Sequence, residues 1–368
     1  MKINWTITDS YIIGKTNDII LQNKKVASFD LDDTLVKTNS GNVSSDDEND
    51  WSIYNDNVVN KLNGLKDKGY HLVIVSNQLG ITKGKVDVNV WKKKIENIIN
   101  HIKLDFTIIC ALKDDMYRKP KTKLWDEFVD GDKKSSFYCG DAGGLPKRKI
   151  NNIEYKKDFS DTDYKFALNL GIKFLHRDEF VLDVKNVKPI ANYPVEFSKI
   201  KTGTYTFTPN KPEMIINVGF PASGKSYYSQ RYVLSNDYEY INQDTLRTKK
   251  KCLIETEKLL KKGVSVIIDN TNMSKAERKE YLDLVKKYNI QCRCLLFTTP
   301  KEVCIHNSHF RNFISNNQVA IIPKIVYNIM NKKYEKPDLS EGFYKIDEIE
   351  FNLKLDQKDK QIYEKYYY

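Results

Sequence analysis

The chain has 368 residues, and at roughly 100–200 residues per domain this length indicates two or three domains. Hydrophobic residues make up 40% and aromatic residues 12%, so the composition differs from that of an intrinsically disordered protein. The 60 Lys and Arg residues against 49 Asp and Glu give a formal net charge of +11, which favours acidic partners such as nucleic acid. The start, MKINWTITDS, lacks an apolar signal-peptide core, no run is long enough to span a membrane, and the six cysteines include no CxxC pair. We therefore expect an intracellular protein with reduced thiols and exclude secreted, membrane-spanning and disulfide-stabilised classes.

Short β-branched and aromatic runs alternate with helix-length polar segments in the first half of the chain. Repetition of strand, helix and strand builds a mainly parallel sheet with flanking helices. Helices are predicted near Asn57–Lys68, Val86–His101 and Leu124–Val129. The predicted strands are Val26–Asp30, His71–Ser76, Phe106–Cys110, Phe137–Cys139 and Ile172–Phe174.

The alternation stops at about residues 181–212, where four prolines flank the stretch TGTYTFTP, which predicts a connector or an edge hairpin. It then resumes with predicted strands at Met214–Val218, Tyr238–Asn242, Val264–Ile268 and Cys292–Phe297 and predicted helices at Lys225–Val233, Thr245–Lys261, Lys275–Tyr288 and Pro300–Asn312. We predict an α/β protein with domains at residues 1–185 and 212–368 and a linker at 186–211. Each domain is expected to be a mainly parallel sheet with flanking helices.

The segment GFPASGKS fits the phosphate-binding pattern GxxxxGK[ST] and lies between an apolar strand and a helix-like segment, as that loop requires. Successive backbone N–H groups and a helix N-terminus would point at nucleotide phosphates. Lys225 would bridge the β- and γ-phosphates, and the Ser226 hydroxyl would hold Mg²⁺. The alternative is a chance glycine loop at a strand–helix turn. The predicted nucleotide-binding loop comprises Gly219, Phe220, Pro221, Ala222, Ser223, Gly224, Lys225 and Ser226.

Three further residues of the second half are candidates for phosphoryl-transfer chemistry. Asp244, after the strand that follows the loop, would stand at the carboxyl edge of the sheet and accept the proton of an attacking hydroxyl, or would only cap the next helix. The strand ending in Asp269 has the form of a metal-ordering acid, and the following NTN is read as turn chemistry. Arg311, in HNSHFRNF, would fold over the γ-phosphate, although a lone helical arginine is usually a surface residue.

In the first half, VASFDLDDT places Asp30 and Asp32 directly after a buried strand. Two acids one residue apart would repel each other, so a bound cation is inferred. Asp30 as a nucleophile on phosphorus and Asp32 as acid and base would follow the logic of an aspartyl-phosphate enzyme. A Ca²⁺ site or a helix cap is the alternative.

Further strand ends point to the same edge of the sheet. Ser76 and Asn77 end the strand HLVIVS and can hydrogen-bond a phosphoryl oxygen. Lys119, in YRKP, can neutralise the transferring phosphoryl group, and Asp141, in GDAGG, offers a third carboxylate for Mg²⁺. Because parallel strands end at one edge, these groups are predicted to form a phosphotransferase site.

With these motifs, the chain resembles the polynucleotide kinase 3′-phosphatases, bifunctional enzymes of DNA-end repair. The resemblance implies a phosphatase of the haloacid dehalogenase superfamily fused to a P-loop kinase. In that family's terms Asp30 matches the nucleophile and Asp32 the acid/base, while Lys225 and Ser226 match the ATP site. Asp141 matches a Mg²⁺ ligand, Ser76 and Lys119 match phosphoryl-binding positions, and Asp244 matches the base that activates the 5′-hydroxyl. The matching segments are FDLDDT, GYHLVIVSNQLGITKGK, YRKP, GDAGG, KKDFSDTDYKFALNLGI, VGFPASGKS, NQDTL, VIIDNTN and SEGFYKIDEIEF.

The chain departs from the family pattern at three positions: Asp33 stands where the family usually has Gly, and Gln243 and His309 stand where Arg is expected. Arg247 lies at a spacing where phage relatives carry a substrate-binding arginine, which is a weaker match. The family's forkhead-associated domain has no room before Lys24. The protein is therefore expected to find its substrate or partners by other means.

Three lysine-rich segments flank the phosphatase motifs: KGK at Lys83–Lys85, WKKK at Trp91–Lys94 and PKRK at Pro146–Lys149. They could hold the phosphates of a nucleic-acid strand, although a solvated helix face is the preferred interpretation for WKKK. Trp51 and Tyr54 could stack on a base or pack in the core.

Together these features predict an enzyme that removes 3′-phosphates and phosphorylates 5′-hydroxyls, with Mg²⁺ and ATP as cofactors. Nucleic-acid strand ends are the expected partner, with a ligase or repair scaffold as further partners, no membrane, and a monomeric state. The expected location is the nucleus or a site of DNA replication or repair. The alternatives are a fused small-molecule phosphatase and metabolite kinase, and a catalytically inactive nucleic-acid-binding scaffold.

Overall fold

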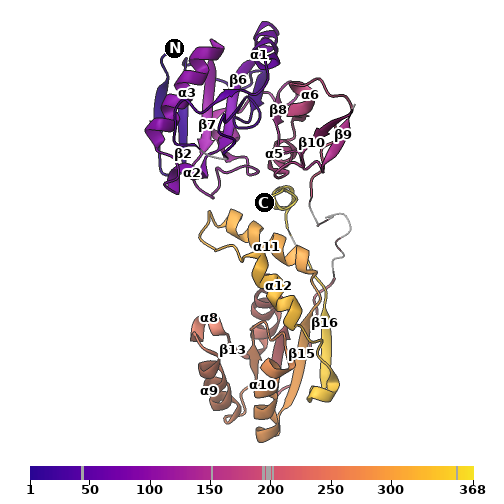
Figure 1. The fold of residues 1–368 in the computed structure, drawn as a ribbon. Helices are drawn as coiled ribbons and strands as arrows, with labels where there is room; N and C mark the ends of the chain where they lie inside the picture. The colour runs from indigo at the N-terminus through magenta and orange to yellow at the C-terminus, as the bar shows by residue number, and fades with distance from the viewer. Residues whose placement is uncertain (43–44, 151, 193–194, 196–199, 201–202, 354) are drawn as a thin grey trace. The chain divides into compact units, whose positions relative to one another are not determined.

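The computed structural model describes residues 1–368 except 43–44, 151, 193–194, 196–199, 201–202 and 354. It divides into two compact units, Met1–Tyr193 with Lys365–Tyr368, and Pro194–Glu364 (Figure 1). Each unit is a mainly parallel sheet with flanking helices, which confirms the predicted fold class. Among the described residues no helix is long and apolar enough to cross a membrane.

The first unit contains a seven-stranded sheet in the order β1-β2-β7-β6-β3-β8-β11. Its parallel strands coincide with the predicted ones to within two residues at each end. The sequence analysis did not predict the antiparallel pair β1 (Asn4–Ile7) and β2 (Tyr11–Lys15), which continues the sheet beyond β7. The parallel strands are β3 (Val26–Phe29), β6 (His71–Asn77), β7 (Phe106–Ala111), β8 (Phe137–Gly140) and β11 (Lys173–His176).

Helices cover both faces of this sheet. The buried side chains of α1 (Asn57–Asp67) and α3 (Val88–Ile102) join one apolar cluster. Those of α4 (Lys123–Phe128) and the unpredicted α5 (Thr162–Leu170) join the cluster on the other face. The unit also has the short elements β4 (Val36–Lys37), β5 (Ser52–Ile53), α2 (Leu79–Thr82), β9 (Arg148–Ile150), β10 (Ile153–Tyr155) and α6 (Arg177–Phe180).

The second unit contains a five-stranded, fully parallel sheet in the order β13-β14-β12-β15-β16. Four of its strands were predicted: β12 (Glu213–Val218), β13 (Glu239–Ile241), β14 (Val266–Ile268) and β15 (Gln291–Phe297). The fifth, β16 (Lys345–Ile349), was not, because alternating charges interrupt its apolar pattern. Other helices of this unit are α10 (Lys275–Tyr288), α11 (Lys301–Ile314), α12 (Lys324–Lys333) and α13 (Gln357–Tyr363).

Three expectations for the second unit need correction. The predicted helix at Thr245–Lys261 is two helices, α8 (Gln243–Leu246) and α9 (Lys249–Leu260), because Arg247 takes a left-handed φ of 70° between them. The helix predicted to reach Val233 is α7 (Lys225–Tyr228), which continues as a π-helical turn. The described part of TGTYTFTP, residues 203–209, contains no strand and forms a connector, and its Tyr205 packs edge-on against Tyr228 with the ring centres 5.0 Å apart.

All six cysteines are free and buried, as the expectation of reduced thiols requires. Burial raises the pKa of every one of these thiols above its ordinary value. The cysteines are therefore core residues.

A buried arginine fixes the segment that follows β14. Arg278 is fully buried, donates two hydrogen bonds of 2.8 Å to the carboxylate of Glu341, and donates to the carbonyls of Asn272 and Met273 at 3.1 and 3.2 Å. Removal of one partner from a buried ion pair leaves the other charge uncompensated. The pair therefore holds the loop after β14 in place.

We expect Arg278→Ala to lower the free energy of unfolding of the second unit by about 3–5 kcal/mol. Urea unfolding followed by circular dichroism would measure this change. Lys279→Ala, at the exposed neighbouring position, is the control and should stay within about 0.5 kcal/mol of the unmodified protein. Equal effects of the two substitutions would contradict the structural role of Arg278.

Candidate active sites

Three carboxylates meet at the carboxyl edge of the first sheet. Asp30 follows β3, Asp141 follows β8, and Asp163 lies in the first turn of α5. One oxygen from each lies within 4.8 Å of the others. The buried Thr34 hydroxyl donates to Asp141 Oδ1 at 3.4 Å. The sequence analysis selected Asp30 and Asp141 but missed Asp163, which reaches the edge from a helix and not from a strand end.

Lys119 connects this group. Its Nζ atom donates to Asp30 Oδ1 at 2.8 Å and to Asp163 Oδ1 at 2.7 Å, and its side chain is buried. Burial acts to lower the pKa of Lys119, but Asp163 and Asp30 outweigh it and raise that pKa above its ordinary value. The Tyr138 hydroxyl accepts a further hydrogen bond from the same ammonium. Lys119 is therefore a charged group aimed at Asp30.

The acidic group has the donor chemistry of a magnesium site. Burial, followed by the negative charges of Asp163 and Asp30, raises the pKa of Asp141 well above its ordinary value. Three close carboxylates thus face the single ammonium of Lys119. A divalent cation would restore the balance, and carboxylate oxygens are the protein ligands that Mg²⁺ prefers. Asp30 and Asp141 would hold it, with Asp163 close by.

Asp32 has different surroundings from Asp30. Its Oδ2 atom accepts a hydrogen bond from Gln78 Nε2 at 2.8 Å, and its Oδ1 atom lies 3.8 Å from Lys94 Nζ. Desolvation raises the pKa of Asp32, against the opposing effect of Lys94. A raised pKa suits a carboxyl group that must carry a proton. The sequence analysis grouped Asp30, Asp32 and Asp141 as the carboxylates for a cation. In the structure the three close carboxylates are those of Asp30, Asp141 and Asp163.

The two residues at the end of β6 have separate roles. The Ser76 hydroxyl is buried beside the site and accepts a hydrogen bond from Gln78 at 3.1 Å. The Asn77 side chain instead exchanges hydrogen bonds of 3.1 and 3.0 Å with the backbone of Lys119. Asn77 therefore positions Lys119, and of this pair Ser76 is the candidate for contact with a phosphoryl oxygen.

In the second unit, the segment from Gly219 to Ser226 consists of the loop Gly219–Gly224 after β12 and the first two residues of α7. Gly224 has a φ of 99°, which favours glycine, and Ala222 has a φ of 58°. The carbonyl of Ser223 accepts from the Thr299 hydroxyl at 2.8 Å, and that of Ala222 accepts from Asn307 at 2.9 Å. The neighbouring elements therefore hold the loop in the strand–loop–helix context that the sequence predicted.

Lys225 folds back on this loop. Its Nζ atom donates to the carbonyls of Gly219 at 2.9 Å and Phe220 at 2.6 Å. Burial lowers the pKa of Lys225 to about 8, and Asp269 acts in the opposite direction. Among the smaller influences on the pKa of Lys225, the positive charge of Arg311 lowers it and the negative charge of Asp244 raises it.

An acidic residue stands beside the loop. Asp269, which follows β14, accepts a hydrogen bond from Ser226 Oγ at 2.6 Å and another from Asn217 Nδ2 at 2.9 Å. The Tyr240 hydroxyl also donates to Asp269. Serine oxygen and carboxylate thus lie together, and this pair has the donor chemistry for Mg²⁺ beside nucleotide phosphates. The sequence analysis missed Tyr240 and Asn217.

The helix-cap alternative for Asp244 is wrong. Asn242 caps α8, because its side-chain oxygen accepts from Thr245 N at 2.8 Å. Asp244 is the second residue of α8 and its side chain is exposed, so its carboxylate is accessible to a ligand. Asn270, in the NTN segment predicted to provide turn chemistry, accepts a long-range hydrogen bond from the backbone N–H of Gln243 at 2.9 Å.

Comparison with known proteins accounts for both units. Residues 25–181 match the family model of the polynucleotide kinase 3 phosphatase, and residues 214–337 match an AAA domain model. A putative bifunctional polynucleotide phosphatase/kinase of Acanthamoeba polyphaga mimivirus is 37% identical over 95% of this chain and 90% of its own length. The bifunctional polynucleotide phosphatase/kinase of Schizosaccharomyces pombe is 36% identical over 98% of this chain and 87% of its own length. The chain belongs to the bifunctional polynucleotide phosphatase/kinase family.

Within the bifunctional polynucleotide phosphatase/kinase family, the departure at Asp33 has a backbone explanation. Asp33 has a φ of 54°, a left-handed conformation that glycine adopts freely and that Asp tolerates better than most residues. Arg177 Nη1 donates to the Asp33 carbonyl at 2.6 Å, and its guanidinium lies 4.4 Å from the centre of the Tyr54 ring. Tyr54 therefore packs under an arginine, and Trp51 packs edge-on against His101. Of the other two departures, Gln243 is exposed on α8 and His309 is half-buried on α11.

The basic residues of the three lysine-rich segments differ in exposure and in their ion pairs. In WKKK, Lys93 is exposed and Lys92 Nζ lies 5.9 Å from the centre of the Trp5 ring, but Lys94 is buried. The solvated-face interpretation is therefore wrong for Lys94. In PKRK, Arg148 pairs with the buried Asp158 and Asp178 and supports the fold. The lysines of these segments that remain exposed are Lys83, Lys85, Lys93, Lys147 and Lys149.

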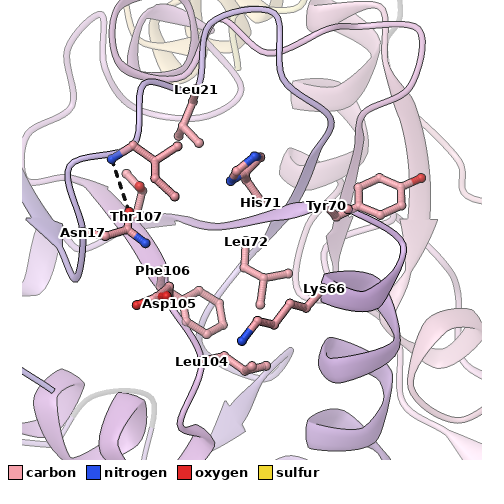
Figure 2. Close-up of a pocket in the computed structure, with 12 residues that line it drawn as sticks. Asn17, Leu21, Lys66, Tyr70, His71, Leu72, Leu104, Asp105, Phe106 and Thr107 are labelled. Carbon is pink, nitrogen blue, oxygen red and sulfur yellow. Dashed lines mark hydrogen bonds between the residues drawn. The ribbon is translucent and has the colours of Figure 1, made fainter.

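A pocket of about 240 Å³ opens at the opposite, amino-terminal edge of the first sheet (Figure 2). Its lining includes His71 and Leu72 at the start of β6 and Phe106 and Thr107 at the start of β7. The acidic group described above lies at the other ends of the strands. In sheets of this kind ligands bind outside the carboxyl ends, so this pocket is separate from the catalytic edge.

Proposed function

We propose that this protein heals nucleic-acid ends: it removes 3′-phosphates in its first unit and phosphorylates 5′-hydroxyls with ATP in its second. The observation that carries the proposal is the presence of two complete phosphoryl-transfer constellations in one chain. The family relatives named for both activities match nearly the whole chain, which supports the same pairing here. The products, a 3′-hydroxyl and a 5′-phosphate, are the ends that a ligase joins.

In the phosphatase step, Asp30 attacks the phosphorus of a 3′-phosphate and forms an aspartyl-phosphate. Asp32 gives its proton to the leaving 3′-oxygen and then takes a proton from the water that hydrolyses the aspartyl-phosphate. Lys119 and Ser76 bind phosphoryl oxygens. Mg²⁺, held by Asp30 and Asp141, would supply positive charge against the charge that develops on the phosphoryl group.

In the kinase step, the loop from Gly219 to Ser226 binds the phosphates of ATP with its backbone N–H groups. Lys225 turns from the carbonyls of its own loop towards the β- and γ-phosphates, and Arg311 approaches the γ-phosphate. Asp244 accepts the proton of the 5′-hydroxyl as that oxygen attacks. Ser226 and Asp269 would hold Mg²⁺, which would neutralise charge on the phosphates.

The second candidate is a fused small-molecule phosphatase and metabolite kinase. The formal net charge of +11 and the family match both disfavour it. The expected partners of the proposed enzyme are strand ends and the ligase or repair scaffold that acts on them next. Its place of action is then a site of DNA replication or repair, where it works as a monomer.

One substrate tests both activities. An oligonucleotide with a 5′-hydroxyl and a 3′-phosphate, offered with ATP and Mg²⁺ as DNA and as RNA, should gain a 5′-phosphate and lose its 3′-phosphate. The two changes cancel in the mass of the strand, so each is measured by itself: transfer of γ-labelled phosphate from ATP reports the 5′-phosphorylation, and release of unlabelled inorganic phosphate reports the loss of the 3′-phosphate. Nucleoside 3′-monophosphates serve as the control. Turnover of these monophosphates without turnover of either oligonucleotide would refute the proposal and support the small-molecule alternative.

A further inference from the structure

Lys94 is the member of the WKKK segment that helix α3 turns inward. It shares a helical stripe with Trp91, Ile95 and Ile98, all of which pack in the apolar cluster on one face of the first sheet. The Lys94 side chain is only 8% exposed. Burial of an ammonium costs free energy unless the charge has a partner. We therefore treat Lys94 as a functional residue and not as a solvated surface charge.

The ammonium of Lys94 faces the phosphatase site. Its Nζ atom lies 3.8 Å from Asp32 Oδ1, which is close enough for attraction and too far for a hydrogen bond. The other oxygen of Asp32 already accepts from Gln78. Within the described part of the chain, no oxygen lies at hydrogen-bond distance from the Lys94 ammonium. An ammonium has three N–H donors, so Lys94 can donate to an oxygen of a ligand bound beside Asp32.

The two buried lysines of the phosphatase site, Lys119 and Lys94, differ in their hydrogen-bond partners and in their position relative to Asp30 and Asp32. Lys119 donates to Asp30, Asp163 and Tyr138, on the side of the nucleophile. Lys94 lies beside Asp32, the group that would protonate the leaving oxygen. It is therefore placed on the side of the leaving group. In a 3′-phosphorylated strand, the leaving group is a nucleotide whose nearest anion is the phosphodiester on its 5′ side.

We infer that Lys94 binds a non-bridging oxygen of the phosphodiester that precedes the 3′-terminal nucleotide. The inference rests on the proposed phosphatase function and names a residue that selects polynucleotides over mononucleotides. A nucleoside 3′-monophosphate has no such phosphodiester and gains nothing from Lys94. Lys94 is thus a substrate-binding residue, distinct from the exposed lysines that act only through long-range charge.

A double-mutant cycle tests this contact. The substrates are two 3′-phosphorylated DNA trinucleotides, one with natural linkages and one with an uncharged methylphosphonate at the last linkage. Lys94→Met should raise KM for the natural substrate by about 10- to 100-fold, the value of one hydrogen bond to a charged group, with a smaller effect on kcat. On the methylphosphonate the two proteins should have the same KM. Lys94→Arg should keep most of the affinity for the natural substrate.

Three controls make the result decisive. Lys66→Met removes the same charge from an exposed position on α1, by the pocket at the opposite edge of the sheet (Figure 2), and should leave both KM values unchanged. Activity of the kinase unit and the melting temperature report on folding. Lys94→Gln, which keeps a polar end, replaces Lys94→Met if the latter does not fold.

Two outcomes would overturn the inference. One is an equal loss of kcat on both trinucleotides and on thymidine 3′-monophosphate with KM unchanged, because Lys94 would then act only through Asp32. The other is an unchanged KM for the natural substrate. If the wild-type protein removes no 3′-phosphate from the natural trinucleotide, it is the proposed phosphatase function that fails. The wild-type measurement therefore separates the two failures.

Discussion

Asp30→Asn is expected to reduce 3′-phosphatase activity by about four orders of magnitude or more, because the amide cannot form the aspartyl-phosphate. The kinase activity of the same protein should stay close to the wild-type value, since the second sheet and its loop are built from other residues. Release of phosphate from a 3′-phosphorylated oligonucleotide measures the first activity. Transfer of labelled phosphate from ATP to a 5′-hydroxyl measures the second.

Asp67→Asn is the matched control for this change, because it makes the same substitution at an exposed position at the end of α1. It should leave both activities unchanged. Trapping gives a direct second readout: brief reaction of the wild-type protein with a 3′-phosphorylated substrate and acid quenching should label Asp30, and Asp30→Asn should take up no label. Phosphatase activity of Asp30→Asn within a factor of about ten of wild type would rule out the covalent mechanism.

The second large effect is expected in the kinase unit. Asp244→Asn keeps the shape of the side chain but removes the proton acceptor, and should lower the rate of 5′-phosphorylation by roughly two to four orders of magnitude. The affinity for ATP should be largely retained, because the Asp244 side chain is exposed on α8 and is not part of the segment from Gly219 to Ser226. Lys225→Ala should lose both turnover and ATP affinity, since Lys225 is expected to hold the phosphates.

The comparison of ATP affinity with turnover decides this assignment. Asp283→Asn makes the same chemical change at an exposed position on α10 and serves as the control. Isothermal titration with ATP and steady-state kinetics on a 5′-hydroxyl oligonucleotide give the two quantities. If Asp244→Asn loses ATP affinity as severely as Lys225→Ala, Asp244 belongs to the nucleotide site, and its role as the base is refuted. Both variants should still remove 3′-phosphates.

Most of the parallel strands could be predicted because their apolar, β-branched runs are buried on both faces. The antiparallel strands β1 and β2 could not, since β1 is mostly exposed and lacks an apolar pattern, and the buried run of β2 is only three residues long. The same reasoning explains the site. The proximity of Asp30, Ser76 and Asp141 could be predicted, because each residue lies at the end of a predicted parallel strand and such strands end at one edge of the sheet.

The residues that escaped prediction reach the site from helices or act through hydrogen bonds. Asp163 arrives at the start of α5, a helix that the sequence analysis did not predict. Lys94 had a readable signal, because it falls in register with Trp91, Ile95 and Ile98, but a run of three lysines suggested a solvated face. Tyr240 of β13 contacts Asp269, which follows the neighbouring strand β14. Its role could not be predicted, because the local sequence pattern does not specify which strands are neighbours.

The burial of all six cysteines has a consequence for oxidation. Sulfenic acids and mixed disulfides form through the thiolate, which requires both access and a low pKa. In both units the thiols lie in the core with raised pKa values, so disulfide reagents and peroxide meet no reactive thiol on the folded protein. The enzyme therefore tolerates oxidants that would inactivate a protein with exposed thiols. A single cysteine introduced at the surface would be the unique target for a fluorescent or cross-linking probe.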